Sequence, residues 1–334
     1  MKQAILHGPR DLRLEELSLD TENLGDHDLW VKTRISALKI GTDRGNYEGA
    51  ERVPGAPDYP RWVGDSNLGI VQKVGPLVTR FAPGDRVYAR LHHQSDYIAP
   101  DTGPLVKVPP GVSDDNAVYL GLYHVSALAF WVGGYVPCET VTVVGLGTLG
   151  LAAVALGSAF GGRVIALGNS SIRLDMAREM GAHLALMSDD PDLEAKIQSF
   201  APETGVDLVV LTANPWPAFR VAAEIVRKNG RITFLSLPGR GEPDLDFNPL
   251  ALEWFHGKAL TLKSVAQNAP DAYPVEGSAY DLRRMGPALL SLMERGVLEP
   301  ERLITHRLPC ERMVEAYEMA YRREKSMLGV IFEW

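Results

Sequence analysis

The sequence predicts an α/β protein with a β-rich first part and a doubly wound parallel sheet in the second. Apolar β-branched runs alternate with segments of helical periodicity between Thr140 and Leu237, which is typical of parallel βαβ units with right-handed crossovers. A glycine-rich turn, Gly145–Gly150, follows the first of these runs, as in dinucleotide-binding sheets. The chain of 334 residues is long enough for two domains.

The first hundred residues are expected to be rich in strands and turns. Leu29–Ser36 alternates apolar and polar or basic residues, which indicates a strand with one face in solvent. Further strands are expected at Leu68–Val74, Arg86–Tyr88 and Tyr97–Ala99, separated by Gly-Pro and Pro-Gly pairs. From Asp114 to Tyr135 the pattern becomes helical.

The alternating segment supplies the elements of the parallel sheet. Its expected strands are Thr140–Val144, Arg163–Leu167, Val206–Leu211 and Arg231–Leu237, and its expected helices are Leu149–Phe160, Ile172–Met180 and Pro217–Arg227. After about Gln267 the pattern is mixed, with helices expected at Leu282–Arg295 and Cys310–Arg322. This last segment is too short to stand alone, so we expect it to rejoin the N-terminal domain.

Composition excludes several classes of function. The net charge is −8, with Lys+Arg 34 against Asp+Glu 42, and no basic run is present, so nucleic acid and acidic membrane surfaces are not expected partners. The longest apolar stretch, Leu120–Gly134, contains His124 and is too short to span a bilayer. Cys138 and Cys310 form no spaced cluster, which fits a reduced, cytoplasmic compartment and cannot supply a four-thiolate zinc site.

The glycine-rich turn predicts a pyrophosphate site. Gly145 allows the sharp turn after the strand, Gly147 allows backbone N–H groups to approach a phosphate at the helix N-terminus, and Gly150 allows close helix–strand packing. Thr148 and Leu149 lie between these glycines and are included in the expected nucleotide contact. The alternative is a glycine turn in an α/β core that binds no ligand.

At this point the chain resembles the medium-chain dehydrogenase/reductase superfamily. The resemblance rests on KIGTDRGNYEG (39–49), GIVQKVGPLVTRFAPGDRV (69–87), LVKVPPGVSDDNA (105–117), VVGLGTLGL (143–151), RLDMAREMGA (173–182) and LITHRLPCERMVEAYEMA (303–320). It implies a GroES-like catalytic domain (1–117 and 267–334), a Rossmann nucleotide-binding domain (118–266) and an active site in the cleft between them. It also implies pyridine-nucleotide hydride transfer to a small-molecule substrate, and a homodimer.

The chain departs from the zinc-dependent members of that superfamily. Those members carry cysteine where this chain has Ile40, Gly-His-Glu where it has Gly64-Asp65-Ser66, and a third ligand near Leu122. Isoleucine and leucine cannot bind zinc, and no cysteine of a structural lobe occurs in Arg90–Tyr97, so we expect both zinc sites, and any other metal, to be absent. In the alternative, Asp65 and one of the adjacent histidines His92 and His93 would hold a metal with only two ligands.

The far end of the second strand favours NADP(H) over NAD(H). An NAD site usually places an acid there, about twenty residues past the glycine turn, whereas this chain has Gly168 followed by Asn169. Ser170, Ser171 and Arg173 offer hydroxyls and a guanidinium suited to a 2′-phosphate. The alternative is that Ser170 caps a helix beginning near Ile172 and that Arg173 is solvated. Further contacts are expected at Thr212, Asn214, Ser236 and Leu237, where ordinary turn chemistry is the competing interpretation.

Three residues are the candidate catalytic groups. The position of Thr42 in the superfamily is the hydroxyl that relays the substrate proton, and Tyr47 and Asp65 are assigned to the same site. Competing structural roles are available for each neighbour. Asp43 would cap a helix beginning at Arg44, Tyr47 would be a partly exposed packing residue, and Asp65 would only stabilise its turn.

The sequence therefore predicts a zinc-independent, NADP(H)-dependent oxidoreductase that acts on an alcohol or carbonyl substrate. One alternative is reduction of an activated C=C bond, in which a conjugated acceptor disperses charge and depends less on a Lewis acid. Another is a catalytically silent nucleotide-binding protein.

Overall fold

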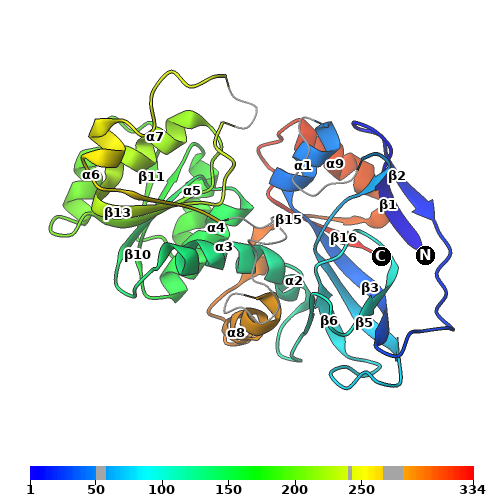
Figure 1. Ribbon diagram of the computed structural model, residues 1–334. Coiled ribbons are helices and arrows are strands. Elements are labelled where there is room, and N and C mark those ends of the chain that lie inside the picture. The colour runs from blue at the N-terminus through cyan, green and yellow to red at the C-terminus, as the bar shows by residue number, and fades with distance from the viewer. Residues whose placement is uncertain (50–57, 240–242, 266–280) are drawn as a thin grey trace. The chain divides into compact units, whose positions relative to one another are not determined.

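The computed structural model describes residues 1–49, 58–239, 243–265 and 281–334, and the chain divides into two compact units (Figure 1). The first unit comprises Met1–Gly121 and Asn268–Trp334, and the second comprises Leu122–Gln267. Within the described ranges, no helix has the length and apolarity needed to cross a bilayer.

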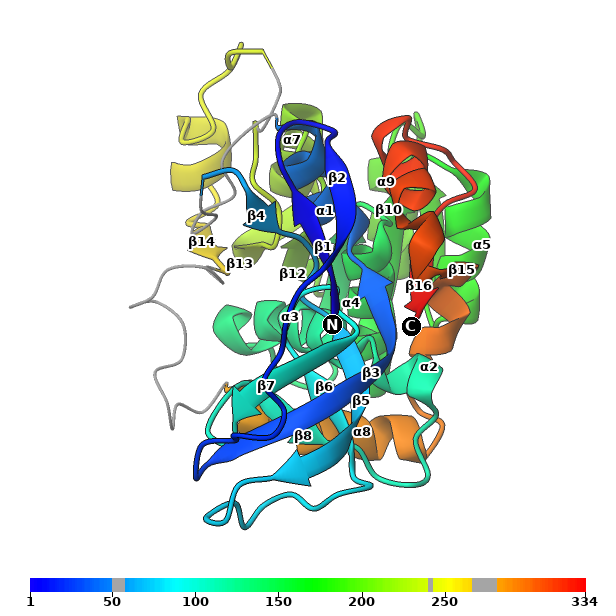
Figure 2. The same ribbon diagram turned by 90° about the vertical axis from the view of Figure 1, so that its right-hand side faces the viewer.

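The first unit is built around a β-rich core that joins the two ends of the chain. Its larger sheet has the order β15-β16-β3-β5-β6-β8, and β7 also pairs with β3 (Figure 2). The strands are β3 (Asp28–Leu38), β5 (Asn67–Val74), β6 (Arg86–Ala89), β7 (Asp96–Pro100), β8 (Leu105–Lys107), β15 (Ile304–Pro309) and β16 (Gly329–Glu333). Strand β16 runs antiparallel to β3, with Val330 opposite Leu38, so the C-terminal segment completes a sheet that begins near the N-terminus.

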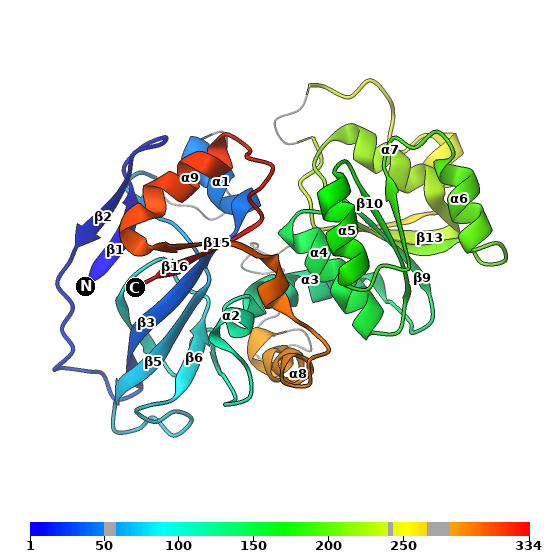
Figure 3. The same ribbon diagram turned by 180° about the vertical axis from the view of Figure 1, so that it is seen from behind.

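The remaining elements of this unit surround that sheet. A second sheet has the order β2-β1-β4, from β1 (Lys2–Leu6), β2 (Leu12–Glu16) and β4 (Arg61–Trp62). The helices are α1 (Ile40–Glu48), α2 (Asp114–Ala117), α8 (Leu282–Glu294) and α9 (Met313–Tyr321), with 3-10 turns η2 (Pro300–Leu303) and η3 (Cys310–Arg312). Helices α1 and α9 lie side by side although they come from opposite ends of the sequence (Figures 1 and 3).

The second unit is a doubly wound parallel sheet with the order β11-β10-β9-β12-β13-β14. Its strands are β9 (Thr140–Val144), β10 (Arg163–Gly168), β11 (Leu184–Met187), β12 (Val206–Leu211), β13 (Val226–Phe234) and β14 (Thr261–Ser264). Its helices are α3 (Leu120–Gly133, which begins in the first unit), α4 (Thr148–Ala159), α5 (Ser171–Glu179), α6 (Leu193–Phe200) and α7 (Trp216–Ile225), with the π-turn η1 (Leu252–His256). This strand order is that of the Rossmann fold, so the predicted α/β class is confirmed.

Strands β9 and β12 have the predicted bounds and β10 extends one residue further, to Gly168, whereas β11 and β14 were not predicted and β13 is shifted, ending at Phe234. Every residue of β9 and β12 is buried, as expected for strands covered on both faces. Strand β13 was expected at Arg231–Leu237 but begins at Val226, directly after α7. The polar run Arg227–Asn229 interrupts the apolar pattern, so the sequence did not indicate this beginning. Asn229 adopts a positive φ of 57° where the register between β12 and β13 shifts.

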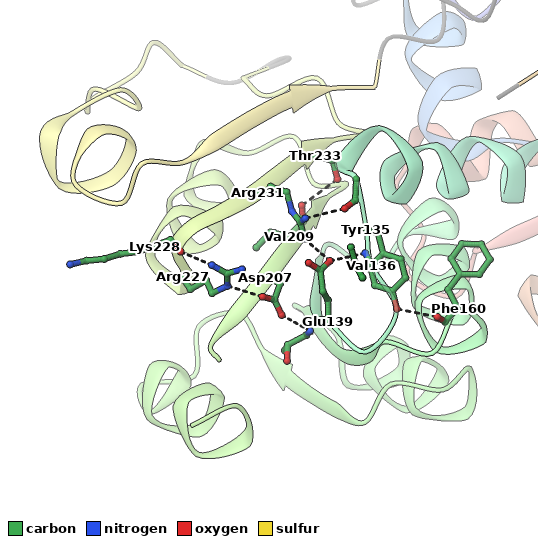
Figure 4. Close-up of polar contacts among 12 residues, drawn as sticks. Tyr135, Val136, Glu139, Phe160, Asp207, Val209, Arg227, Lys228, Arg231 and Thr233 are labelled. Atoms are coloured by element: carbon green, nitrogen blue, oxygen red, sulfur yellow. Dashed lines mark hydrogen bonds and ion pairs between the residues drawn. The ribbon is translucent and has the colours of Figure 1, made fainter. Parts of the chain in front are cut away.

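Two ion pairs stabilise the amino ends of the central strands (Figure 4). Asp207, on β12, accepts a hydrogen bond from the Thr140 N–H at 2.8 Å and pairs with Arg227 at 2.7 Å. Glu139 pairs with Arg231 and accepts from the Val136 N–H at 3.1 Å. These groups occupy the edge opposite the carboxyl ends of the strands, where a ligand binds in such sheets.

Candidate active site

The glycine turn joins the carboxyl end of β9 to the N-terminus of α4. Gly145 has a φ of +99°, a conformation that favours glycine, and a Cβ at Gly150 would lie 1.9 Å from the Gly145 carbonyl oxygen. Gly147 is the N-cap of α4, and a Cβ added there would meet no atom within 4 Å. Two glycines are therefore required by packing and backbone, while the third leaves open space at the positive end of a helix of 12 residues.

Side chains at the ends of neighbouring strands support this turn. The Thr212 hydroxyl donates to the Gly145 carbonyl at 2.7 Å, and the Asn214 side-chain oxygen accepts from the Leu237 N–H at 3.0 Å. Ser236 differs, because its hydroxyl is buried and has no hydrogen-bond partner among the described residues. Thr212 and Asn214 thus have structural bonds, whereas the Ser236 hydroxyl has no partner among the described residues.

Within the turn itself, Thr148 is buried and Leu149 is half-buried on α4. Leu237 lies beyond β13 and is 49% exposed. Of the expected nucleotide contacts, Thr148 and Leu149 are therefore more buried than Leu237.

A tightly packed glycine ends β10, and a cation follows it on α5. A Cβ at Gly168 would lie 2.8 Å from the Leu146 Cδ1 atom, so an acid there would displace a residue of the glycine turn. Arg173 is half-buried on α5, burial lowers the pKa of its guanidinium, and it has no partner among the described residues. Asn169 and Ser171 are exposed. Ser170 is the N-cap of α5 by position, but its side chain makes no capping hydrogen bond.

In the first unit, α1 begins earlier than its sequence suggested. The helix begins at Ile40 rather than Arg44, so the expectation of a cap at Asp43 for a helix beginning at Arg44 is wrong. Asp43 instead lies buried inside α1, where its carboxylate accepts from the Lys39 N–H at 2.8 Å and the Gly64 N–H at 3.2 Å. Burial, followed by the charge of Asp65, raises the pKa of Asp43 to about 7. Thr42 lies exposed on the same turn.

Asp65 is held between two cations. The Lys39 ammonium lies 2.8 Å from its carboxylate, and Arg90 Nε lies 3.5 Å away. Burial opposes ionisation of Asp65, but the two positive charges outweigh it and hold the pKa of its carboxyl below the usual value. Burial also lowers the pKa of the Lys39 ammonium, despite the neighbouring carboxylates. Lys39 and Arg90 were not among the residues singled out from the sequence, because no periodicity relates them to Asp65.

Tyr47 does not join this group. Its ring is fully buried, contrary to the expectation of a partly exposed packing residue, and its hydroxyl donates to Glu318 Oε1 at 2.7 Å. Arg10 also donates to Glu318, at 2.9 Å and 3.0 Å. Burial and the Glu318 carboxylate raise the pKa of Tyr47 to about 12. The hydroxyl of Tyr47 therefore ties α1 to α9, away from the Lys39–Asp65 pair.

The two adjacent histidines have separate environments. His92 stacks on Trp62 with ring centroids 3.8 Å apart, and burial lowers its pKa to about 4. His93 is buried, its Nδ1 lies 2.8 Å from the Ser36 hydroxyl, and burial lowers its pKa to about 3. Both rings are neutral near pH 7. Among the residues that the structure describes, no three His, Cys, Asp or Glu side chains are grouped so as to hold a metal ion.

The comparisons with known proteins agree with this architecture. Residues 148–274 match the family described as zinc-binding dehydrogenase. The chain is 24% identical over 363 residues to the sorbitol dehydrogenase of Bacillus subtilis (strain 168), in a match that covers 99% of this chain and 96% of that protein.

Two solved structures share the fold but differ in nucleotide. A Sinorhizobium meliloti 1021 protein bound to NADP matches 100% of this chain and 99% of its own, with a TM-score of 0.79 and 18% identity. An Escherichia coli CFT073 protein, called a short chain alcohol dehydrogenase and complexed with NADH, has a TM-score of 0.80 and 20% identity, over 100% of this chain and 99% of its own. The chain is therefore similar to zinc-binding dehydrogenases over residues 148–274 and to a sorbitol dehydrogenase over nearly its full length, and it shares the fold of these solved dehydrogenase structures.

Proposed function

We propose that this chain is a zinc-independent, NADP(H)-dependent enzyme that transfers a hydride between the nicotinamide and an alcohol or carbonyl group of a small molecule. The chain is an oxidoreductase, and relatives such as the sorbitol dehydrogenase support action on alcohols. The observation that carries the finer proposal is the glycine turn with open space at Gly147, together with a half-buried, unpaired Arg173 among the described residues.

The preference for NADP(H) rests on charge at the end of β10. No carboxylate stands at Gly168, and Arg173 with Ser170 and Ser171 offers donors that suit a phosphate. Since solved relatives of this fold hold either nucleotide, the fold does not decide between them. The local residues favour NADP(H).

The side chains at the zinc positions do not fit that metal. Ile40 has no donor atom, and the Asp65 carboxylate is already engaged by Lys39 and Arg90, so a zinc ion would lie against two cations. The proposed reaction therefore does not use zinc.

Hydrogen-bond donors of the chain would serve the reacting oxygen instead. NADPH supplies a hydride to the carbonyl carbon, the π electrons pass to the oxygen, and the oxygen must then take a proton. Thr42 is exposed on the first turn of α1 and is our candidate for relaying that proton. The buried Tyr47 hydroxyl is bonded to Glu318, which argues against a direct role and for a structural one.

Reduction of an activated C=C bond is the second candidate. Its supporting observation is Ile40, because an enone or quinone spreads the developing charge over an enolate and needs no metal. The exposed Thr42 and the intact glycine turn argue against a catalytically silent protein.

Substrate class is tested by following NADPH oxidation at 340 nm with ketones, aldehydes, enones and quinones. Turnover of ketones or aldehydes supports the proposal, and turnover of enones or quinones alone supports the second candidate. Tight NADPH binding without any turnover would favour the silent protein. One equivalent of zinc in the purified protein, by elemental analysis, would overturn zinc independence.

Nucleotide choice is tested with a matched pair of variants at Gly168. Gly168→Ala adds the Cβ that presses on Leu146, and Gly168→Asp adds both the Cβ and a charge. We expect Gly168→Ala to weaken NADPH and NADH equally, and Gly168→Asp to weaken NADPH much further than NADH. Equal losses in Gly168→Asp would contradict the NADP(H) assignment.

We also propose a cytoplasmic homodimer. Both cysteines are free, Cys138 exposed and Cys310 buried, which suits a reducing compartment. Light scattering after size-exclusion chromatography measures the assembly directly, and a mass of one chain would exclude the dimer.

A further inference from the structure

We propose that Lys39 is the group that faces the negative charge developing on the substrate oxygen and gives that oxygen its proton. The inference rests on the proposed carbonyl reduction and names the residue that replaces a Lewis acid. It is carried by the geometry of the Lys39–Asp65–Arg90 cluster, which belongs wholly to the first unit.

The cluster is a built arrangement rather than a chance surface pair. Lys39 is the N-cap of α1, and its ammonium lies 2.8 Å from the carboxylate of Asp65, on the turn after Gly64. The side chains of Lys39 and Asp65 are only 12% and 28% exposed, so the pair is mostly withdrawn from water but still reachable. Exposed ion pairs, by contrast, are easily broken by solvent and salt.

Two cations of the cluster lie beside one carboxylate. Lys39 and Arg90 both face the single ionised carboxylate of Asp65. The charge of Asp43 also acts on Lys39, and the raised pKa of Asp43 leaves it partly protonated near neutral pH. His93, which faces Asp65, is neutral. A partly desolvated cation stabilises a developing oxyanion more strongly than one in bulk water.

Lys39 also lies beside the candidate proton relay. Lys39 is the N-cap residue that precedes α1, and Thr42 lies exposed in the first turn of that helix. An ammonium has three N–H donors, and Asp65 has two carboxylate oxygens to accept from it. One donor is left for a substrate oxygen or for the Thr42 hydroxyl.

Reduction of the carbonyl group takes one hydride and one proton. The carbonyl carbon gains the hydride and its two electrons, while the C=O π pair moves onto oxygen. That oxygen takes a proton from the Lys39 ammonium, directly or through Thr42, and becomes the alcohol hydroxyl. Burial of Lys39 favours release of its proton to the substrate oxygen. The neutral Lys39 amine then regains a proton from solvent.

The test compares Lys39→Met, which removes the charge, with Lys39→Arg, which keeps it. The control is Lys196→Met, on the surface of the second unit. It removes the ammonium that pairs with Asp190 at 2.6 Å. A readout without turnover is calorimetric binding of benzoate and of neutral benzamide to the NADP⁺-saturated protein. A carboxylate oxygen mimics the charged oxygen, whereas the amide has the same shape without the charge.

We expect wild type, Lys39→Arg and Lys196→Met to bind benzoate at least about tenfold more tightly than benzamide, and Lys39→Met to lose that preference. In the turnover assay, Lys39→Met should lower kcat about 100-fold or more. Lys39→Arg should also lower kcat, because a guanidinium keeps the charge but does not release its proton. A Lys39→Met protein within about threefold of wild type in both readouts would overturn the inference, as would a wild type that does not distinguish benzoate from benzamide.

The two proposals fail in distinguishable ways. If wild type turns over none of the carbonyl compounds but shows a benzoate preference that depends on Lys39, the proposed reaction is wrong and the oxyanion site is kept. If wild type and Lys39→Met reduce ketones equally well, the proposed reaction is kept and the role of Lys39 is wrong.

Discussion

At the level of single residues, Arg173 is the side chain whose environment is hardest to explain without a ligand. It is half-buried on α5, and among the described residues its guanidinium has no partner, although burial lowers its pKa. A charged group without a partner is costly to withdraw from water. A 2′-phosphate beside it would offset that cost.

We therefore expect Arg173→Leu to weaken NADPH binding about 10- to 100-fold and to leave NADH nearly unchanged, since a hydrogen bond to a charged group contributes about 1.5–3 kcal/mol. Fluorescence titration with each nucleotide measures this. Arg178→Leu on the same helix, whose guanidinium pairs with Asp175, is the matched control and should change neither. A parallel loss of both nucleotides in Arg173→Leu would show that Arg173 serves the helix and not the phosphate.

Asp43 gives a prediction about pH. Its pKa is about 7 in the folded chain and about 3.9 in an unfolded one, so the folded state holds the proton more tightly. The contribution of Asp43 to stability is therefore fully present below about pH 4 and is lost as the pH rises through about 7. Other groups titrate in the same range, so the quantity to compare is the difference between wild type and Asp43→Asn.

The unfolding free energy of wild type minus that of Asp43→Asn should fall between pH 4 and 7, by up to about 1.4 kcal/mol per pH unit. Urea unfolding at four pH values in that range provides the measurement. Asp11→Asn is the control, because the pKa of exposed Asp11 is lowered by Arg13 and its difference should stay level. A level difference for Asp43→Asn would mean that Asp43 is ionised throughout.

At the level of elements, a lysine side chain donates hydrogen bonds to the carbonyl oxygens at the C-terminus of α7. Lys258 Nζ donates to the carbonyl oxygens of Ala223, Glu224 and Val226 at 2.8, 2.6 and 2.9 Å. The last carbonyls of a helix have no partner within it, and a cation there also complements the helix dipole. Lys258 thus ends α7 where β13 begins.

Lys258→Met should lower the unfolding free energy of the second unit by about 1–3 kcal/mol, because three acceptors lose a charged donor. Lys228→Met, at an exposed lysine near the same turn, should change it by less than about 0.5 kcal/mol. Chemical unfolding gives both values, and hydrogen exchange of the last turn of α7 shows whether the loss is local. Equal values for the two variants would refute the capping role.

The elements also show which parts of the fold can be predicted from sequence. Strands β9 and β12 have the predicted bounds because all their residues are buried and most are apolar and β-branched or leucine. The beginning of α1 could not be predicted, since IGTDRGNYE has no apolar periodicity and long-range bonds hold the helix in place, from Gly64 to Asp43 and from Tyr47 to Glu318. Propensity and pattern yield to tertiary contacts in such a segment.

The same distinction applies to the candidate site. The glycine turn was predictable because its constraint is local, a clash 1.9 Å from the Gly145 carbonyl within six residues. The Lys39–Asp65–Arg90 cluster brings together three separate segments of the chain, and nothing in their spacing announces the contact. These three charged residues come together only through long-range contacts of the folded chain, so the sequence did not predict their cluster.

At the level of the whole molecule, each unit has its own apolar core. In the first unit, Leu6, Leu38 and Phe332 belong to one buried cluster, which therefore needs both ends of the chain. In the second unit, Val144, Leu211 and Phe219 share another cluster that comes from continuous sequence. Two cores of this kind are expected to unfold as separate cooperative units rather than in a single two-state step.

Calorimetry should then resolve two transitions that respond to different changes. NADPH at about 100 times its Kd should stabilise the second unit by about 2.7 kcal/mol and raise only its transition. Phe332→Ala, at a fully buried ring, should destabilise the first unit by about 3–5 kcal/mol and lower only the other transition. Leu211→Ala is the matched control, buried in the second unit, and should lower the transition that NADPH raises. Because each change is confined to one core, a single transition that all three move together would show that the two units fold as one.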